Sequence, residues 1–253
     1  MMNFYIVSLL DALAEHNLPI FCNLNFVNSA ALFSDFDQIS ERFESVTDFY
    51  FSFLRKLEFI PYKAFVKNHY GYYDFTNVNG YDLSVNEVMN NLSQKKIVNN
   101  ELMPVKVRFT DTEKMHLLVG FFRIEHIKNG FLHVVDLCLP KNEIKNIPSG
   151  VSYVKEILDS YIPNEKQTLR EFIETKGFNY NHFQRDSKIC FGDSFYSFWL
   201  KGKMIDAAGD IIFTPMSLKE IAFKNKFLDY QNMYKTFHRY GVGLPTIPRL
   251  ANL

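Results

Sequence analysis

The sequence predicts an α+β N-terminal domain with an antiparallel sheet and helices, followed by an all-α C-terminal domain with two helix-turn-helix motifs joined by a linking helix. Three observations predict this organisation. The apolar runs that suit strands all lie before Pro140. Two similar blocks with helix-capping signals follow, over about 168–192 and 217–243. The turn-forming segment 146–150 lies between these regions, so we divide the chain into domains 1–148 and 149–253.

The N-terminal domain is predicted to begin with an amphipathic helix within the first twenty residues and to continue with a strand over 18–28. A long helix is expected from Asp35 to Leu57, because aromatic and apolar residues recur there at helical spacing. The aromatic stretch 63–73 is ambiguous. The later elements are a helix over 85–92 capped by Ser84 and strands over 104–109, 116–127 and 131–139, the last two joined by an Asn-Gly hairpin turn.

The C-terminal domain is predicted to open with a helix over 151–161. Both blocks beyond it begin with a hydroxyl residue and a leucine, at Thr168 and Ser217, and such a hydroxyl caps a helix by accepting from free backbone N–H groups. A turn and a second cap, Asn179 or Asp229, precede a second helix in each block. The linking helix has an apolar side formed by Phe195, Phe198, Trp199, Ile205 and Ala208, with Lys201, Lys203, Asp206 and Asp210 pointing elsewhere.

This layout resembles the DNA-binding domain of the AraC/XylS family of bacterial transcription regulators, over roughly the last hundred residues. The positions that fit the family's pattern are Phe183, Lys188, Gly192, Phe195, Phe198, Lys203, Met204, Ala207, Ile221, Ala222, Phe227, Asp229, Met233, Phe237, Pro245 and Arg249. Ser187 replaces a core aromatic, and Ile173 replaces a small residue where two helices cross. Lys226 replaces the turn glycine, so either Lys226 or Asn225 must take the left-handed backbone conformation.

Polar side chains on the second helix of each block are the candidate DNA-binding residues. They are Tyr180, Asn181, Gln184, Arg185 and Lys188 in the first block and Tyr230, Gln231, Asn232, Tyr234 and Lys235 in the second. Glutamine can make paired hydrogen bonds to adenine, and arginine can do so to guanine, in the major groove. The alternative for either helix alone is an ordinary solvated face.

The resemblance implies a transcription regulator, and an activator is expected. Its partners would be double-stranded DNA and RNA polymerase, with a small-molecule effector and a homodimer as further possibilities. We expect no cofactor. The first half is weakly similar to a PAS sensor domain. The alternative is a sensory or protein-interaction module whose helix-turn-helix domain no longer reads DNA. We find no motif that favours an enzyme.

Composition sets limits on these interpretations. The net charge of the 253 residues is zero, but residues 1–150 carry 14 basic and 17 acidic side chains, and residues 151–253 carry 14 and 11. A positive second half suits DNA binding. Three widely spaced cysteines, Cys22, Cys138 and Cys190, indicate buried thiols in a reducing compartment. The apolar N-terminus lacks a preceding basic residue, so we expect a cytoplasmic protein that does not enter a membrane.

Histidines of the predicted sheet were weighed as metal ligands. His116, His126 and His133 fall on neighbouring predicted strands with Glu125 nearby, an arrangement compatible with a metal site. Single histidines on strands are more often ordinary core or surface residues, and that interpretation is preferred. Asp111, Glu113 and Asp136 form no convincing acid pair.

Overall fold

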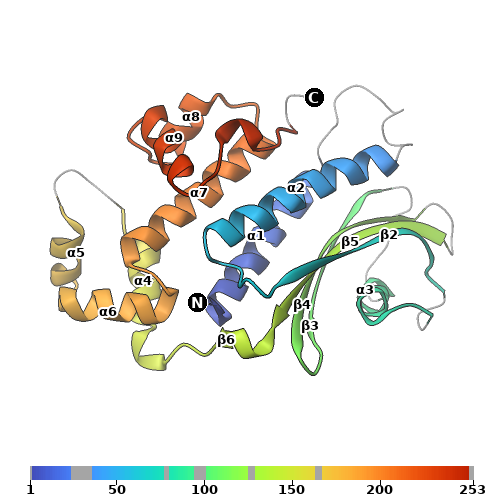
Figure 1. The fold of residues 1–253 in the computed structure, drawn as a ribbon, viewed down its shortest axis with the longest axis horizontal. Coiled ribbons are helices and arrows are strands. Elements are labelled where there is room, and N and C mark those ends of the chain that lie inside the picture. Colours follow the sequence, from blue (N-terminus) through green and yellow to red (C-terminus); the bar gives the residue numbers. More distant parts are fainter. Residues whose placement is uncertain are drawn as a thin grey trace.

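The computed structural model describes residues 2–23, 36–76, 80–93, 101–124, 129–162 and 167–250. The first part is built on one antiparallel sheet. Its four strands, in the spatial order β2-β5-β4-β3, are β2 (Phe65–Asp74), β5 (Asn129–Pro140), β4 (Lys114–Ile124) and β3 (Met103–Thr110) (Figure 1). The three later strands are confirmed where the structure describes them, but Asn129 and Gly130, expected in the hairpin turn, are the first paired residues of β5. Residues 125–127 of the predicted strand lie outside the described part of the chain. The ambiguous stretch 63–73 is largely strand β2.

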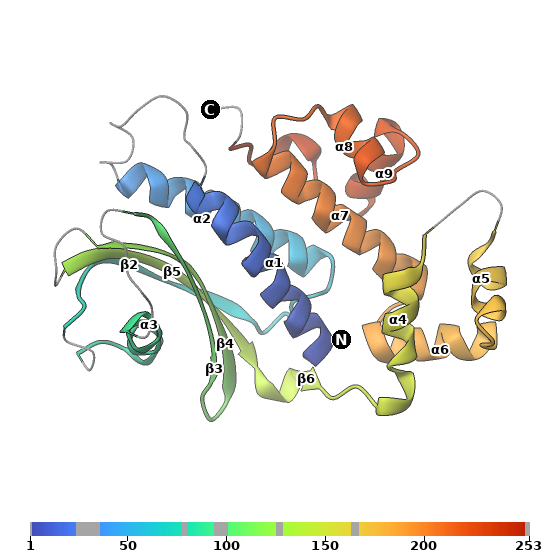
Figure 2. The same ribbon diagram turned by 180° about the vertical axis from the view of Figure 1, so that it is seen from behind.

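Helices cover both faces of this sheet. Helices α1 (Phe4–Asn23) and α2 (Phe36–Lys56) lie across one face, and α3 (Leu83–Ser93) lies against the other (Figures 1 and 2). The central strands β4 and β5 are buried along most of their length because both faces are covered. A short parallel pair, β1 (Met2–Asn3) with β6 (Ile144–Lys145), places Met2 and Asn3 beside the segment that follows β5.

Two details of the sequence prediction for the first half are wrong. Residues 18–23 are not strand, because α1 continues through Pro19 to Asn23; residues 24–28 lie outside the described part of the chain. A proline inside a helix removes one hydrogen bond. Leu18, Phe21 and Cys22 nevertheless repeat at helical spacing and are buried, and this burial offsets the cost. The other detail is the α3 cap: the Val85 amide donates to Asp82 Oδ1 at 3.0 Å, and Ser84 lies inside the helix.

The second part is helical. Its helices in chain order are α4 (Tyr153–Ser160), α5 (Leu169–Thr175), α6 (Tyr180–Phe191), α7 (Phe195–Phe213), α8 (Leu218–Lys224) and α9 (Tyr230–Arg239). Single 3₁₀ turns occur at Lys141–Glu143, Ser149–Val151 and Leu244–Thr246. The predicted helices of both blocks and the helix between them are therefore confirmed, while the boundary at residue 148 stays a prediction.

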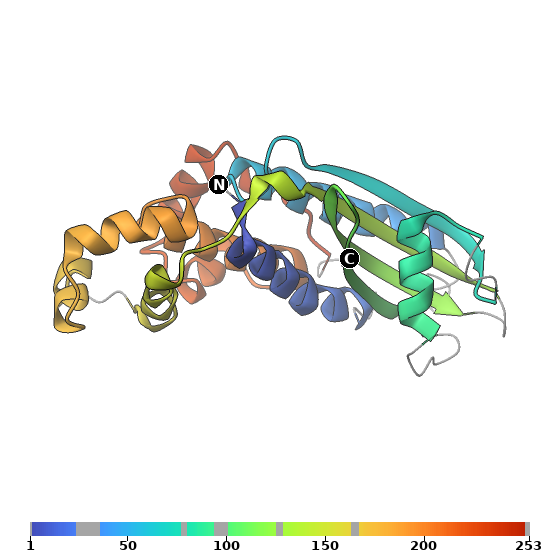
Figure 3. The ribbon, with the colours of Figure 1, turned by 90° about the horizontal axis from the view of Figure 1, so that it is seen from below.

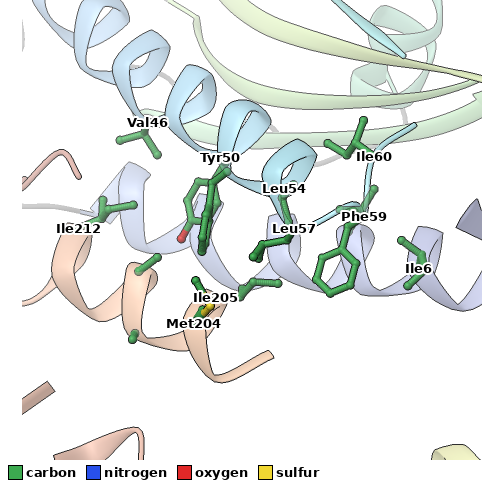
Figure 4. Close-up of a cluster of buried hydrophobic side chains, with 14 of the residues drawn as sticks. Ile6, Val46, Tyr50, Leu54, Leu57, Phe59, Ile60, Met204, Ile205 and Ile212 are labelled. Carbon is green, nitrogen blue, oxygen red and sulfur yellow. The ribbon is translucent and has the colours of Figure 1, made fainter. Parts of the chain in front are cut away.

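Helix α7 connects the two parts of the molecule. It runs alongside α1 and α2 on the side away from the sheet, with α6 packed near its start and the α8–α9 pair along its side (Figures 2 and 3). One hydrophobic cluster includes buried residues of α1, α2 and α7. Figure 4 shows Tyr50 and Leu57 pointing toward Met204 and Ile205 of α7. The helix that separates the two blocks is thus part of a core shared with the first half.

Lys201 on α7 differs from its prediction. It was expected to point away from the apolar side of the helix, but only 4% of it is exposed. Its ammonium lies 2.8 Å from Asp193 Oδ2 and 3.6 Å from Glu58 Oε2, and it also lies near the rings of Phe59 and Tyr240. A buried cation needs such partners because leaving water is costly. Lys201 therefore ties α7 to the segment that follows α2.

Candidate nucleic-acid interface

The α5–α6 pair and the α8–α9 pair begin in the same way. The Thr168 hydroxyl accepts from the Glu171 amide at 3.3 Å, and the Glu171 carboxylate accepts from the Thr168 amide at 2.7 Å. Ser217 and Glu220 repeat this reciprocal capping box at 3.3 and 2.8 Å. Hydrogen bonds from the Thr168 amide and hydroxyl hold the pKa of the Glu171 carboxyl below its ordinary value. Each first helix therefore starts at the residue that the sequence predicts.

Both pairs also cap their second helix with a side chain. Asn179 Oδ1 accepts from the amides of Asn181 and His182 at 3.0 and 3.1 Å. Asp229 Oδ1 accepts from the Asn232 amide at 2.7 Å. These contacts fix the direction in which α6 and α9 leave their turns, and so fix which side chains reach the surface.

The turns use a left-handed residue at equivalent places. Gly177 has φ of 82°, which a glycine adopts without strain. Lys226 has φ of 56°, whereas Asn225 has φ of −86°, so the lysine and not the asparagine takes the left-handed position. The Lys203 ammonium donates to the Lys226 carbonyl and lies 4.4 Å from the ring centre of Phe227. That contact holds the strained turn residue in place.

Exposure divides the candidate side chains of α6. Asn181, Arg185 and Lys188 are exposed, and Tyr180 and Gln184 are half-buried. The Arg170 guanidinium lies 4.7 Å from the centre of the Tyr180 ring, which positions that ring at the start of the helix. The structure brings all five residues to one exposed side of α6, as the sequence predicts.

Arg185 has partners on its inner side. Its Nε lies 3.4 Å from Asp186 Oδ1, and Asp186 in turn accepts from the Tyr153 hydroxyl at 2.8 Å. Tyr153 belongs to α4, so a chain of contacts that begins on α4 orients the Arg185 side chain. Its guanidinium keeps donors free for a ligand, because guanidinium carries five N–H groups.

A groove beside α6 contains a basic residue that sequence reasoning missed. Its volume is about 400 Å³, and its walls are formed by Asn3, Lys145, Asn146, Pro148, Arg185, Lys188 and Ile189. Lys145 reaches the groove because β6 pairs with β1 next to α6. Side chains of three basic residues therefore border one concave surface, whose lining is mostly apolar. The signal in the sequence was only a lysine at the end of the predicted sheet, which carries no such information.

The exposed side of α9 is polar like that of α6, but the α8–α9 pair also exposes large apolar side chains. Gln231, Asn232, Tyr234 and Lys235 are exposed, and Tyr230 is half-buried. His238 and Arg239 extend the polar side by one turn. Phe223 and Leu228, on the preceding helix and turn, are each 84% exposed. Exposed apolar side chains of this size indicate a contact surface when they gather in one place.

Core residues behind the two second helices differ in kind. Phe183 and Ser187 lie on the buried side of α6 and are fully buried. The Ser187 hydroxyl donates to the Phe183 carbonyl at 2.7 Å. Met233 and Phe237 are fully buried behind α9. Ile173, at the predicted helix crossing, is also fully buried. The serine that replaces an aromatic residue therefore satisfies its hydroxyl inside its own helix.

A second candidate site is an apolar cavity of about 120 Å³ between the sheet and helices α1 and α2. Apolar side chains of the two helices and the sheet line most of it, together with Phe213 from the end of α7. Its polar groups are Asn17, Thr47 and Tyr50, with Asn17 Nδ2 donating to the Tyr50 hydroxyl at 3.3 Å. Burial raises the pKa of Tyr50. The cavity suits a small apolar molecule with one polar group.

The structure does not bring His116 and His133 together. His116 pairs with Cys138 on the α3 face of the sheet, whereas His133 pairs with Phe121 on the face toward α2. His126 and Glu125 lie outside the described residues. Burial lowers the pKa of His133 to about 4. The three cysteines are buried thiols without disulfides, as predicted.

Comparison with known proteins gave no match among protein-family models, curated proteins or solved structures. Within the described part of the chain, no helix has both the length and the apolar character needed to cross a membrane.

Proposed function

We propose that the protein is a sequence-specific DNA-binding transcription regulator in which the α5–α6 and α8–α9 pairs are the two helix-turn-helix motifs of an AraC-type domain. One observation carries this proposal: the same set of features occurs twice along the chain, once before α7 and once after it. Each pair has a capping box, a left-handed turn residue, a second capped helix and an exposed polar side on that helix. The packing of an ordinary helical bundle does not require this whole set of features to occur twice.

The length of α7 supports the same proposal. Its 19 residues span roughly 28 Å at the helical rise of 1.5 Å per residue. Successive major grooves on one side of B-DNA are about 34 Å apart. Phe183 of α6 packs on Phe195 at the start of α7, and Lys224 at the end of α8 pairs with Asp210 near the last turn of α7, so the two pairs have attachment points roughly 22 Å apart along this helix. In this proposal α6 and α9 enter neighbouring major grooves on one side of the duplex.

The proposed roles follow from side-chain chemistry. Gln184 and Arg185, one turn into α6, contact base edges, because both side chains can make paired hydrogen bonds there. Lys188 and Lys145 line the basic groove and contact phosphates. On α9, Gln231, Asn232 and Lys235 occupy the corresponding exposed side. Tyr180, Asn181, Tyr230 and Tyr234 flank these residues and contact the backbone of the duplex.

The first half is proposed as the regulatory part. Its apolar cavity is close in size to an engineered cavity of roughly 150 Å³ that binds benzene, so a small apolar effector is the expected ligand. Phe213 belongs both to the cavity wall and to α7, so an occupant contacts the helix that carries both motifs. Activation through RNA polymerase and homodimerisation are further parts of the proposal, and both rest on the family resemblance.

The test is selection of genomic or random DNA fragments on the purified full chain, followed by binding of the enriched sequence at two salt concentrations. A common sequence motif is expected among the retained fragments. Arg185→Ala should weaken binding to that motif far more than binding to random DNA. Lys188→Ala should weaken both and reduce the salt dependence by about one unit of slope. The matched control is Lys106→Ala, which removes a cation of β3 that pairs with Glu15. It should change neither binding to the motif nor binding to random DNA.

A protein-interaction module is the competing function, and the exposed side chains of Phe223 and Leu228 favour it. In that case the retained fragments share no sequence, and Arg185→Ala behaves like Lys106→Ala. The double substitution Phe223→Ser with Leu228→Ser would then abolish binding to a protein partner. If α6 binds DNA, the same double substitution should leave binding to the enriched motif unchanged.

A further inference from the structure

Three potential metal-binding side chains meet on the α3 face of the sheet, on the opposite side from α1 and α2. His116 of β4 lies opposite Cys138 of β5, and Asp136 is two residues before Cys138, so all three side chains share one face. They are 5%, 0% and 0% exposed, respectively. This buried group is outside the proposed DNA interface and outside the apolar cavity.

The three side chains converge on one point. His116 Nδ1 lies 2.9 Å from Asp136 Oδ2 and 3.7 Å from Cys138 Sγ. All candidate ligand atoms lie within 4.8 Å of one another. A tetrahedral ion that binds N, O and S at about 2.0–2.3 Å holds these atoms roughly 3–4 Å apart. The His116–Cys138 distance already falls in this range, and the His116–Asp136 contact must open by a few tenths of an ångström to admit such an ion.

The surroundings are those that orient metal ligands. Asp111 Oδ2 lies 3.1 Å from His116 Nε2, so a carboxylate holds the far nitrogen and turns Nδ1 toward Asp136 and Cys138. The Ser84 hydroxyl donates to Asp136 Oδ2 at 2.7 Å. The Phe109 ring stacks on the imidazole with ring centres 4.4 Å apart. Each ligand thus has a fixed direction before any ion binds.

We propose that His116, Asp136 and Cys138 form a binding site for a divalent transition metal of the zinc class. One nitrogen, one carboxylate oxygen and one sulfur are ligands that zinc accepts, whereas magnesium and calcium avoid thiolates. Binding releases two protons to solvent, the Cys138 thiol proton and the proton shared between His116 Nδ1 and Asp136. The dication then faces two anionic ligands, Asp136 and the Cys138 thiolate, so the buried site becomes electrically neutral. Water fills the fourth position.

The site would join three elements of the first half. Two ligands come from β5 and one from β4, and Ser84 brings in the start of α3 through Asp136. Metal binding therefore stabilises the contact of α3 with the sheet. This role does not depend on DNA binding and can be tested separately from it.

The test uses the full chain after removal of bound metal with a chelator. Titration with Co²⁺ should show one equivalent bound per chain and a thiolate-to-metal charge-transfer absorption. Zn²⁺ should displace the cobalt and raise the thermal midpoint of unfolding. Cys138→Ser should remove the charge-transfer absorption, while Cys22→Ser and Cys190→Ser, at the other two buried thiols, should retain it.

Two more variants separate a metal site from a hydrogen-bonded ion pair. Asp111→Asn should keep the absorption but weaken Zn²⁺ affinity roughly 10–100-fold, the usual effect of losing a residue that orients a ligand. His133→Gln, on the opposite face, should leave affinity unchanged. The proposal is overturned if the stripped full chain binds no cobalt, or if Cys138→Ser binds zinc as tightly as the unaltered protein. The first measurement needs no variant, so poor folding of a variant cannot obscure the result.

Discussion

The α5–α6 and α8–α9 pairs are alike at their first helix and differ at the turn. Three residues, Lys176, Gly177 and Phe178, separate the end of α5 from the Asn179 cap. Four residues separate the end of α8 from the Asp229 cap, and the additional one is Leu228, which is exposed. Equivalent hydrogen bonds, from Phe178 to Ile173 and from Phe227 to Ala222, place the insertion after the left-handed residue. The second helix therefore leaves the two turns differently.

The pairs also differ in charge. Residues 168–191 contain four basic and three acidic side chains, for a net charge of +1, whereas residues 217–240 contain five and two, for +3. Phosphate attraction is independent of sequence, and base recognition depends on placed donors and acceptors. The first pair, with an oriented arginine and an unstrained turn, suits base recognition. The second pair, more basic and with a strained turn, suits general attachment to the duplex.

The largest expected difference between the pairs is in the core behind the second helix. Phe237→Ala should lower the free energy of unfolding by about 3–5 kcal/mol, because a fully buried ring that stacks on Phe53 is removed. Ser187→Ala, at the equivalent place behind α6, should cost about 1 kcal/mol or less, since only a hydrogen bond within one helix is lost. Urea denaturation of both variants measures this. Equal losses would show that the two cores are alike.

A smaller difference is expected in sequence discrimination. Arg185→Ala should lose about 1–3 kcal/mol of binding at one base position of the selected motif. Lys235→Ala should weaken all sequences by a similar factor, because the α8–α9 pair is proposed to hold the phosphates. Binding to a series of single-base variants of the selected sequence measures both. The assignment is reversed if Lys235→Ala relaxes one base position while Arg185→Ala weakens every sequence equally.

The smallest expected difference is in the turns. Gly177→Ala should destabilise the protein by about 1–2 kcal/mol, because alanine is strained at positive φ. Lys226→Gly should stabilise it by up to about 1 kcal/mol, since relief of strain exceeds the entropy cost of an added glycine. Thermal unfolding of the two variants gives the comparison, with Lys226→Ala as the control that retains the strain. Destabilisation by Lys226→Gly would mean that the lysine side chain itself supports the turn.

Sequence alone predicted the second half more fully than the first, for a physical reason. Capping residues such as Thr168 and Asp229 act on their own backbone, so their signal is local. The sequence prediction for the end of α1 is wrong because Pro19 and the apolar run around it resemble a strand. The helix is stabilised there by contacts with distant residues, since Phe21 packs against Phe43 and Phe121.

The candidate sites show the same limit. The exposed face of α6 follows from helical spacing within one segment, and it was predicted. The approach of Lys145 to Lys188, and of His116 to Asp136, depends on strand pairing between distant parts of the chain. The buried position of Lys201 depends on Glu58, far away in the sequence. Pairings of this kind leave no periodic signal in either segment.

The packing of α7 against α1 and α2 has a consequence for evolution. In a protein whose halves meet only at a linker, recombination can exchange one half for another. Here such an exchange would uncover Met204, Ile205 and Ile212, and would leave the matching side of α2 exposed to water. A hybrid protein would begin with an apolar stripe along its central helix. Exchange of either half would therefore require matching apolar side chains on α7 and on α1 and α2.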